Sequence, residues 1–80
     1  MKEILEFIIS AIVENQKEVK IDEQEDNGVV TLTISVAKED MGRVIGKSGK
    51  IIRAIRNIMK IPALKQGKKV FINLADIPQE

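Results

Sequence analysis

Hydrophobic residues recur with helical spacing in two segments of the chain. The first segment predicts an amphipathic helix over about residues 2–15. Its apolar positions are Leu5, Ile8, Ile9, Ile12 and Val13. The second predicts a helix that begins near Lys50 and ends at Pro62, because proline cannot continue the helical hydrogen-bond ladder. Its apolar positions are Ile51, Ile52, Ile55, Ile58 and Met59.

Three other segments alternate between apolar and polar residues, as half-buried strands do. They are a short segment around residues 19–22, a longer one over about residues 29–37 and a last one over residues 70–74. Asn27 and Gly28 lie between the first two, and this pair favours a tight hairpin turn in which both residues have positive φ. The first two segments are therefore expected to form an antiparallel hairpin with one face covered.

A short helix, Met41–Ile45, is expected between the second and third strands, with Asp40 as its N-cap and Gly46 after its end. The element order is then α-β-β-α-α-β. Two helices between two strands suit a right-handed parallel crossover. The predicted fold class is α+β, with three helices covering one face of a three-stranded mixed sheet. We expect a single domain over residues 1–80, with its core over about residues 2–75 and a short C-terminal tail over residues 76–80.

The chain has 80 residues, enough for one domain, and contains neither Cys nor His. These absences exclude a disulfide framework, a thiolate nucleophile, a Cys/His zinc site and most nucleophilic triads. We therefore expect no enzyme, no catalytic residue, no metal and no cofactor. No apolar run is long enough to span a membrane, and acids interrupt the first apolar segment. We accordingly expect no signal peptide, no membrane contact and a cytoplasmic location.

Charge is segregated along the chain, although the net charge is only +1. Residues 1–40 carry four lysines against ten acids, a net charge of −6, whereas residues 41–75 carry nine Lys and Arg residues and no Asp or Glu. The last five residues contribute −2. This basic window, residues 41–75, is either a solvated surface or an anion-binding face, and nucleic acid is the commonest large polyanion.

A glycine loop, Gly46-Lys47-Ser48-Gly49, lies inside the basic window. It is not a nucleotide-binding P-loop, because that motif needs a glycine at the position of Met41 and an acid that can hold Mg²⁺. Two residues without Cβ let a sugar-phosphate backbone lie against the loop, and the next helix directs its N–H groups at the same place. Lys47 adds a flexible cation. The alternative is an ordinary corner between two helices.

The segment from Val44 to Ile52, VIGKSGKII, resembles the signature of the KH domain, whose GXXG loop clamps a nucleic-acid backbone. The element order is that of the type II, bacterial arrangement. The chain, with DMGRVIGK leading into the loop, is similar over essentially its whole length to the small bacterial stand-alone KH proteins of the KhpA family. The resemblance implies an RNA-binding protein that holds about four nucleotides of single-stranded RNA. It also implies a role as a post-transcriptional regulator or RNA chaperone.

The resemblance and the basic window together indicate the site residues. Those expected to bind RNA are Arg43, Gly46, Lys47, Ser48, Gly49, Lys50, Arg53, Lys68 and Lys69. Candidates for an apolar groove floor, or for the core beneath it, are Val44, Ile45 and Ile51. The last strand and the loop over residues 65–69 would form the other wall. Only Phe7 and Phe71 are aromatic, so we expect no aromatic stacking platform.

A second hypothesis assigns the basic face to protein docking, with RNA binding secondary. The resemblance implies self-pairing as a homodimer, and pairing with a larger RNA-binding partner protein that carries a KH domain of its own. A single weak binding module would gain avidity from either kind of pairing.

Overall fold

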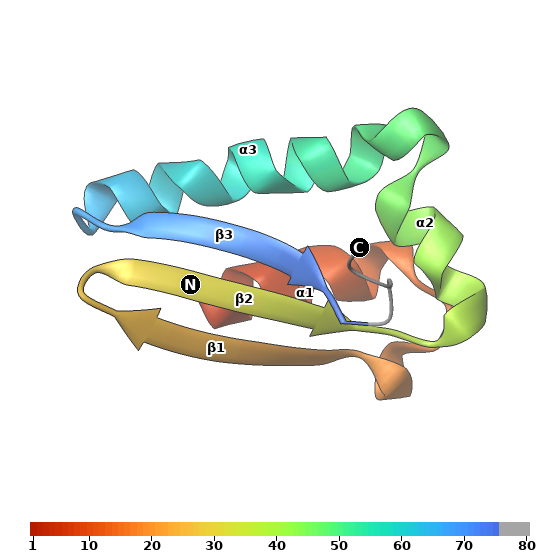
Figure 1. The fold of residues 1–80 in the computed structure, drawn as a ribbon. Helices are drawn as coiled ribbons and strands as arrows, with labels where there is room; N and C mark the ends of the chain where they lie inside the picture. The colour runs from red at the N-terminus through yellow and green to blue at the C-terminus, as the bar shows by residue number, and fades with distance from the viewer. Residues whose placement is uncertain (76–80) are drawn as a thin grey trace.

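The computed structural model describes residues 1–75, which form helices packed on a three-stranded sheet (Figure 1). In chain order the elements are α1 (Lys2–Ile12), the 3₁₀ turn η1 (Gln16–Glu18), β1 (Lys20–Asp26), β2 (Val29–Ser35), the 3₁₀ turn η2 (Lys38–Asp40), α2 (Met41–Ile45), the turn η3 (Lys47–Gly49), α3 (Lys50–Lys65) and β3 (Lys69–Leu74). The expected α+β fold and element order are confirmed. The expected tail, residues 76–80, lies outside the described residues.

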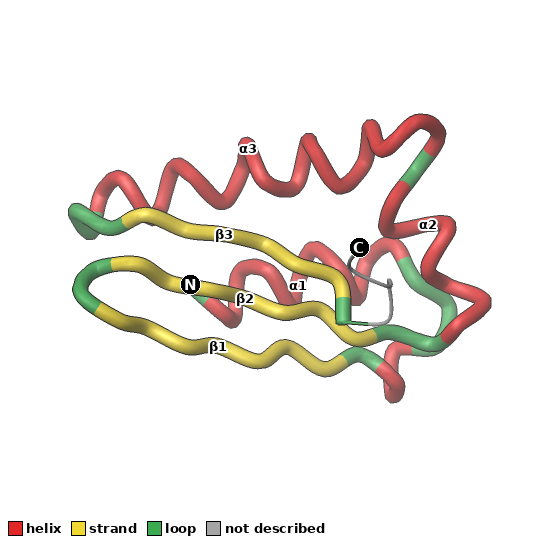
Figure 2. Tube along the Cα trace, in the orientation of Figure 1, coloured by secondary structure: helices red, strands yellow, loops and turns green. Residues whose placement is uncertain are grey.

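The sheet has the order β1-β2-β3, with β1 antiparallel and β3 parallel to the central strand (Figure 2). Asp26 pairs with Val29, so the hairpin closes through Asn27 and Gly28, which have φ values of 52° and 79°. These are the positive angles that a two-residue hairpin turn requires. The predicted hairpin and the parallel crossover are both confirmed.

The core lies between one face of the sheet and the helices. The register aligns Ile21, Ile34 and Leu74 across the three strands, and all three side chains are buried. Helix α1 lies behind the sheet in Figure 1, and α3 runs alongside β3 in the opposite direction. The helices bury residues on one face each, namely Leu5 and Ile9 on α1 and Ile52, Ile55, Met59 and Ala63 on α3. A single apolar layer therefore holds the domain together.

Strand β1 is longer than its sequence pattern predicts. Alternation of apolar and polar residues is visible only around residues 19–22, yet β1 continues to Asp26. Glu23 and Glu25 pair with Leu32 and Val30, so they occupy positions that face the same way as the buried Ile21. Both glutamates are exposed, so their polar side chains are tolerated at these positions. The backbone pairing of β1 with β2 in the hairpin, rather than the burial of side chains, extends the strand to Asp26.

Pro62 lies inside α3, so the expectation that it ends this helix is wrong. Its missing N–H removes one helical hydrogen bond, but the last turn remains anchored by the buried Ala63. The N–H groups of Gln66 and Lys68 donate to the carbonyls of Pro62 and Ala63 at 3.2 Å and 2.9 Å. The chain leaves the helix through Gly67, whose φ is 67°, and enters β3 directly.

Asp40 does not cap α2 with its side chain, contrary to expectation. Its carboxylate, only 1% exposed, accepts hydrogen bonds from the backbone N–H groups of Glu14 at 3.2 Å and Asn15 at 3.0 Å, and from the Asn15 side-chain amide at 3.1 Å. These bonds hold the chain after α1 in an extended course that starts at Val13, where ψ is 157°. The helix therefore ends before residue 15, and Asp40 joins the start of α2 to the end of α1.

These contacts make stability depend on the ionisation of Asp40. The backbone N–H of Asn15 is the main cause that holds the pKa of Asp40 below its ordinary value of 3.8; burial opposes it, and the Glu14 N–H, the Asn15 amide and the charge of Arg43 lower it further. A lowered pKa stabilises the fold above pH 3.8, and this contribution is lost as the pH falls through the folded-state pKa.

We expect Asp40→Asn to have a lower free energy of unfolding than the wild type at pH 7, and this difference to shrink below pH 3.8. Urea titrations at a series of pH values measure it. The control is Asp22→Asn, which removes an exposed carboxylate from β1. A difference between wild type and Asp40→Asn that stays constant down to pH 2 would contradict the assigned role.

Candidate nucleic-acid interface

The Gly46–Gly49 loop reverses the chain between α2 and α3 with an unusual backbone. Gly46 has φ 74° and ψ 173°, a combination open essentially only to glycine. A Cβ at Gly46 would lie 2.8 Å from the backbone nitrogen of Ile51 and would overlap its side chain. Ser48 and Gly49 follow in the left-handed helical region, with φ values of 57° and 74°. The loop is therefore a tight turn seated directly on the first turn of α3.

Two exposed residues, Lys47 and Ser48, form the apex of this loop. Within residues 1–75, their backbone N–H groups have no hydrogen-bond acceptor, whereas the flanking N–H groups of Gly46 and Gly49 donate to Gly42 and Gly46 at 2.9 Å and 3.2 Å. Successive unpaired N–H groups in a turn form a concave site for an anion. The Lys47 ammonium adds a positive charge at the same place, so the apex suits a phosphate group.

Arg53 braces the loop from α3. Its Nη2 donates to the carbonyl of Ser48 at 2.7 Å and its Nε donates to the carbonyl of Gly49 at 3.2 Å. Arg53 was expected to contact phosphate, and the structure places it beside the loop with part of its guanidinium already engaged. The same side chain also lines the adjoining groove, where its remaining N–H groups are available to a ligand.

A groove runs between α3 and β3, starting beside the loop. Its cavity has a volume of about 400 Å³ and is lined by Arg53, Arg56, Asn57, Lys60, Val70, Phe71, Ile72 and Asn73. Arg56 spans the groove floor, because its Nε and Nη2 donate to the carbonyl of Ile72 at 3.3 Å and 3.1 Å. Helix α3 thus contributes cations to one wall of the groove, and the edge strand β3 forms the opposite wall.

Two of the expected RNA-binding cations are held by acids instead. The guanidinium of Arg43 forms ion pairs with Glu14 and, at 3.5 Å, with Asp40, so it belongs to the junction of α1 and α2. Lys68 forms an ion pair with Glu25 of β1 at 2.9 Å. Lys47, Lys50 and Lys69 are exposed and form no ion pair within residues 1–75.

Three apolar residues beside the loop were candidates for the groove floor or for the core beneath it. Val44 is fully buried in the core cluster, so it offers no surface to a ligand. Ile45 packs against the same cluster and Ile51 packs against Gly46. The residues that line the groove include none of these three. The apolar part of the groove comes instead from Val70, Phe71 and Ile72. These residues belong to β3, which is the edge strand next to α3.

Sequence reasoning predicted Arg53 but missed three other groove residues on α3, namely Arg56, Asn57 and Lys60. Arg53, Asn57 and Lys60 are spaced by four and three residues, so they share one stripe of the helix, and Arg56 lies beside it. Counting polar residues at this spacing would have found the stripe. Asn73 gives no such signal, because its place in the groove depends on β3 lying at the edge of the sheet.

Within residues 1–75, no three or more Asp and Glu side chains gather in a way that could hold a metal ion. None of the helices in this part of the chain combines the length and the apolar character needed to cross a membrane.

Comparison with known proteins gives matches over nearly the whole chain. A family model described as "KhpA/KhpB, KH domain" matches residues 2–74. Among similar proteins, the "RNA-binding protein KhpA" of Clostridium acetobutylicum is 40% identical over 74 residues, which are 92% of this chain and 99% of that protein. The proteins of the same name from Clostridium perfringens and Listeria monocytogenes are 39% and 37% identical, and the matches cover 92% and 95% of this chain and 99% and 100% of theirs.

The two loop glycines are expected to differ in their tolerance of a side chain. Gly46→Ala should lower the free energy of unfolding by about 3 kcal/mol, since backbone strain adds to overlap with Ile51. Gly49→Ala should cost only about 1 kcal/mol, because its Cβ would meet Ile52 at 4.0 Å in a left-handed conformation that other residues adopt. Urea unfolding measures both values.

A third glycine provides a control of opposite sign. Gly42 lies in α2 with open space around it, so Gly42→Ala should raise the free energy of unfolding by about 0.5–1 kcal/mol. Equal losses of stability in the Gly46 and Gly49 variants would show that the contact with Ile51 does not constrain the loop.

Proposed function

Because this chain belongs to the KhpA/KhpB family of KH domains, we propose that it binds short single-stranded RNA with the Gly46–Gly49 loop and the groove between α3 and β3. The observation that carries the proposal is the position of the loop. Two unpaired N–H groups and the Lys47 ammonium lie at one end of a cleft whose helical wall carries Arg53, Arg56 and Lys60. A polyanion fits this arrangement better than a neutral ligand does.

The loop and the groove have separate tasks in this proposal. The loop holds phosphates, since it offers backbone donors and positive charge but no surface that distinguishes one base from another. The groove receives bases, since it combines the aliphatic Val70 and Ile72 with the amides of Asn57 and Asn73. Each amide presents a donor and an acceptor, which is what hydrogen bonding to base edges requires.

The proposed role is binding without catalysis, as in a post-transcriptional regulator or RNA chaperone of the cytoplasm. The chain has no His or Cys to act as a base or nucleophile. Its buried carboxylate, Asp40, is fully engaged with backbone and amide donors and lies outside the groove. Among the residues of 1–75 that line the groove between α3 and β3, none is an Asp or Glu that could act as a general acid or base.

We also propose that the chain pairs with a second copy or with a larger KH-containing partner. Large apolar side chains are exposed on α1 and α3, which pack against each other: Ile4, Phe7, Ile58 and Ile61. Phe7 is 78% exposed. Burying such residues against a partner would stabilise a complex, and pairing two weak RNA sites would raise their joint affinity.

Replacing Lys47 and Ser48 together by Asp should abolish RNA binding and leave the fold intact, because both side chains are exposed. In the wild type, affinity should fall with salt, and a variant that removes one phosphate interaction should reduce the slope of log affinity against log salt by about 0.7. Fluorescence anisotropy with a labelled single-stranded RNA at several salt concentrations measures both quantities, and circular dichroism checks the fold.

The matched control replaces Gln16 and Lys17 by Asp. These residues belong to η1, carry the same formal charges as Ser48 and Lys47, and lie outside the loop and the groove. The control should bind nearly as the wild type does. If the loop variant keeps the affinity and the salt slope of the wild type, the loop is not the site.

Phe7→Glu should shift the chain toward the monomer without weakening its RNA affinity per site, because Phe7 lies on α1, outside the groove. Sedimentation velocity with and without RNA measures the assembly state. A wild type that stays monomeric with and without RNA argues against self-pairing. A tight dimer that ignores RNA favours the docking hypothesis instead.

A further inference from the structure

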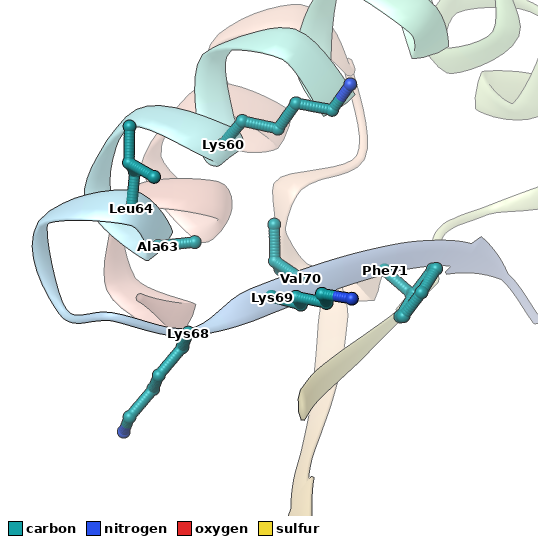
Figure 3. A pocket seen from close by; sticks show the side chains of 7 residues that line it. All are labelled: Lys60, Ala63, Leu64, Lys68, Lys69, Val70 and Phe71. Carbon is teal, nitrogen blue, oxygen red and sulfur yellow. The ribbon is translucent and has the colours of Figure 1, made fainter. Parts of the chain in front are cut away.

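A second cavity continues the groove at the end far from the loop (Figure 3). It has a volume of about 380 Å³ and shares Lys60, Val70 and Phe71 with the first. Helix α3 adds Ala63 and Leu64, and Val70 points from β3 toward this helix. From Lys50 to Leu64, α3 rises about 21 Å, so the two cavities together extend well beyond the loop.

The chemistry of the groove changes along its length. Leu64 follows Arg53, Asn57 and Lys60 at helical spacing, so it is the last member of the same stripe. Near the loop this stripe is cationic and polar, but at its far end it presents a leucine that is 81% exposed. A single exposed apolar residue is common on protein surfaces, so Leu64 matters here because it lines the same cavity as Phe71.

Phe71 lies on the opposite wall and is also outside the core. It alternates with the buried Ile72 along β3, and its side chain is 56% exposed. It lines both cavities, so it stands where they join. The core is complete without this ring, because Ile72 and Leu74 supply the buried positions of β3. The ring and the leucine line the cavity from β3 and from α3, so both give it apolar surface that a flat ligand can contact.

The charges around the cavity identify the class of ligand. Lys60 and Lys69 form no ion pair within residues 1–75, and the third cation, Lys68, is neutralised by Glu25. Apolar walls with unpaired ammonium groups at the rim match a nucleotide, which has an aromatic base and an anionic phosphate. Continuity with the proposed RNA groove favours a nucleotide of the same strand over a separate molecule.

We infer that this cavity binds one further nucleotide of the RNA strand, with its base stacked on Phe71, Leu64 adding apolar contact, and its phosphate beside Lys60 and Lys69. The inference rests on the proposed function. Stacking tolerates every base, because each has a π-face. The cavity should therefore add affinity with little sequence preference, and only for strands long enough to reach past the groove.

The test measures the affinity gained by lengthening the RNA. Synthetic single-stranded RNA pools of random sequence, about four and about six nucleotides long, are titrated by anisotropy against the full chain. The wild type should bind the longer pool about tenfold more tightly. Phe71→Ala and Leu64→Ser should lose this gain and bind the shorter pool as the wild type does. Ala54→Ser, which changes an exposed residue of α3 outside both cavities and outside the proposed pairing surface, is the control and should keep the gain.

A second readout reports on the ring directly. The chain contains no Trp, so Phe71→Trp introduces a single fluorophore at the cavity. Its emission should be quenched by the longer pool and much less by the shorter one, and this variant should retain the length-dependent gain. Equal quenching by both pools, or a gain that survives in Phe71→Ala, would overturn the inference. So would an emission shift that depends on protein concentration without RNA, because it would indicate a protein partner at the cavity.

The outcomes separate this inference from the proposed function. If the wild type binds neither pool, the proposed function fails and the inference fails with it. If the wild type binds both pools and the Lys47/Ser48 variant binds neither, the loop is the RNA site. A failure of the Phe71 and Leu64 variants to change the gain would then remove the further inference alone.

Discussion

The structure depends on a single backbone constraint, the reversal of the chain at Gly46. Helix α2 must place Val44 in the core, and α3 must place Ile52 and Ile55 there a few residues later. A Cβ at position 46 would overlap the side chain of Ile51 and lie 2.8 Å from its backbone nitrogen, so this position requires glycine. The same reversal turns the N–H groups of Lys47 and Ser48 away from helical partners. The packing of α2 and α3 in the core and the unpaired N–H groups at the loop apex therefore have one cause.

The positive charge of the basic window is divided between structure and surface. Arg43, Arg53, Arg56 and Lys68 bind protein acceptors, so each of them fixes an element or a loop. Lysines at the loop, at mid-groove and at the start of β3 are unpaired in the part of the chain that the structure describes. For the three arginines this role follows from side-chain chemistry, because the planar guanidinium makes directed bonds to carbonyls and carboxylates, whereas Lys68 is held by the charge of Glu25.

Local patterns predicted the fold well because each of its elements is encoded locally. Helical and alternating periodicities, the Asn-Gly turn and the GXXG loop all lie within a few residues of the feature that they specify. The errors concern effects that arise only in three dimensions. Pro62 stays helical because the following turn is anchored in the core, and Asp40 serves the end of α1 across 25 residues of sequence. For the same reason the sequence left open whether the apolar residues beside the loop line the groove or the core. Val44 and Ile51 flank the loop in sequence, but the open edge of β3 decides which apolar residues line the cleft.

The scarcity of aromatic residues takes on a different meaning once the groove is located. A platform of several rings would be needed to hold bases without the help of a loop, and this chain has two phenylalanines. In the proposed function the loop fixes the backbone of an RNA strand, so the bases that enter the adjoining groove lose less freedom on binding. Under that condition one ring is useful, provided that it lies where the cleft continues beyond the reach of the loop. Phe71 lies at that junction, and the exposed Leu64, from the stripe that begins with Arg53, lines the second cavity with it. The same sheet edge thus supplies one wall of the groove and, among the described residues that line it, the one aromatic ring.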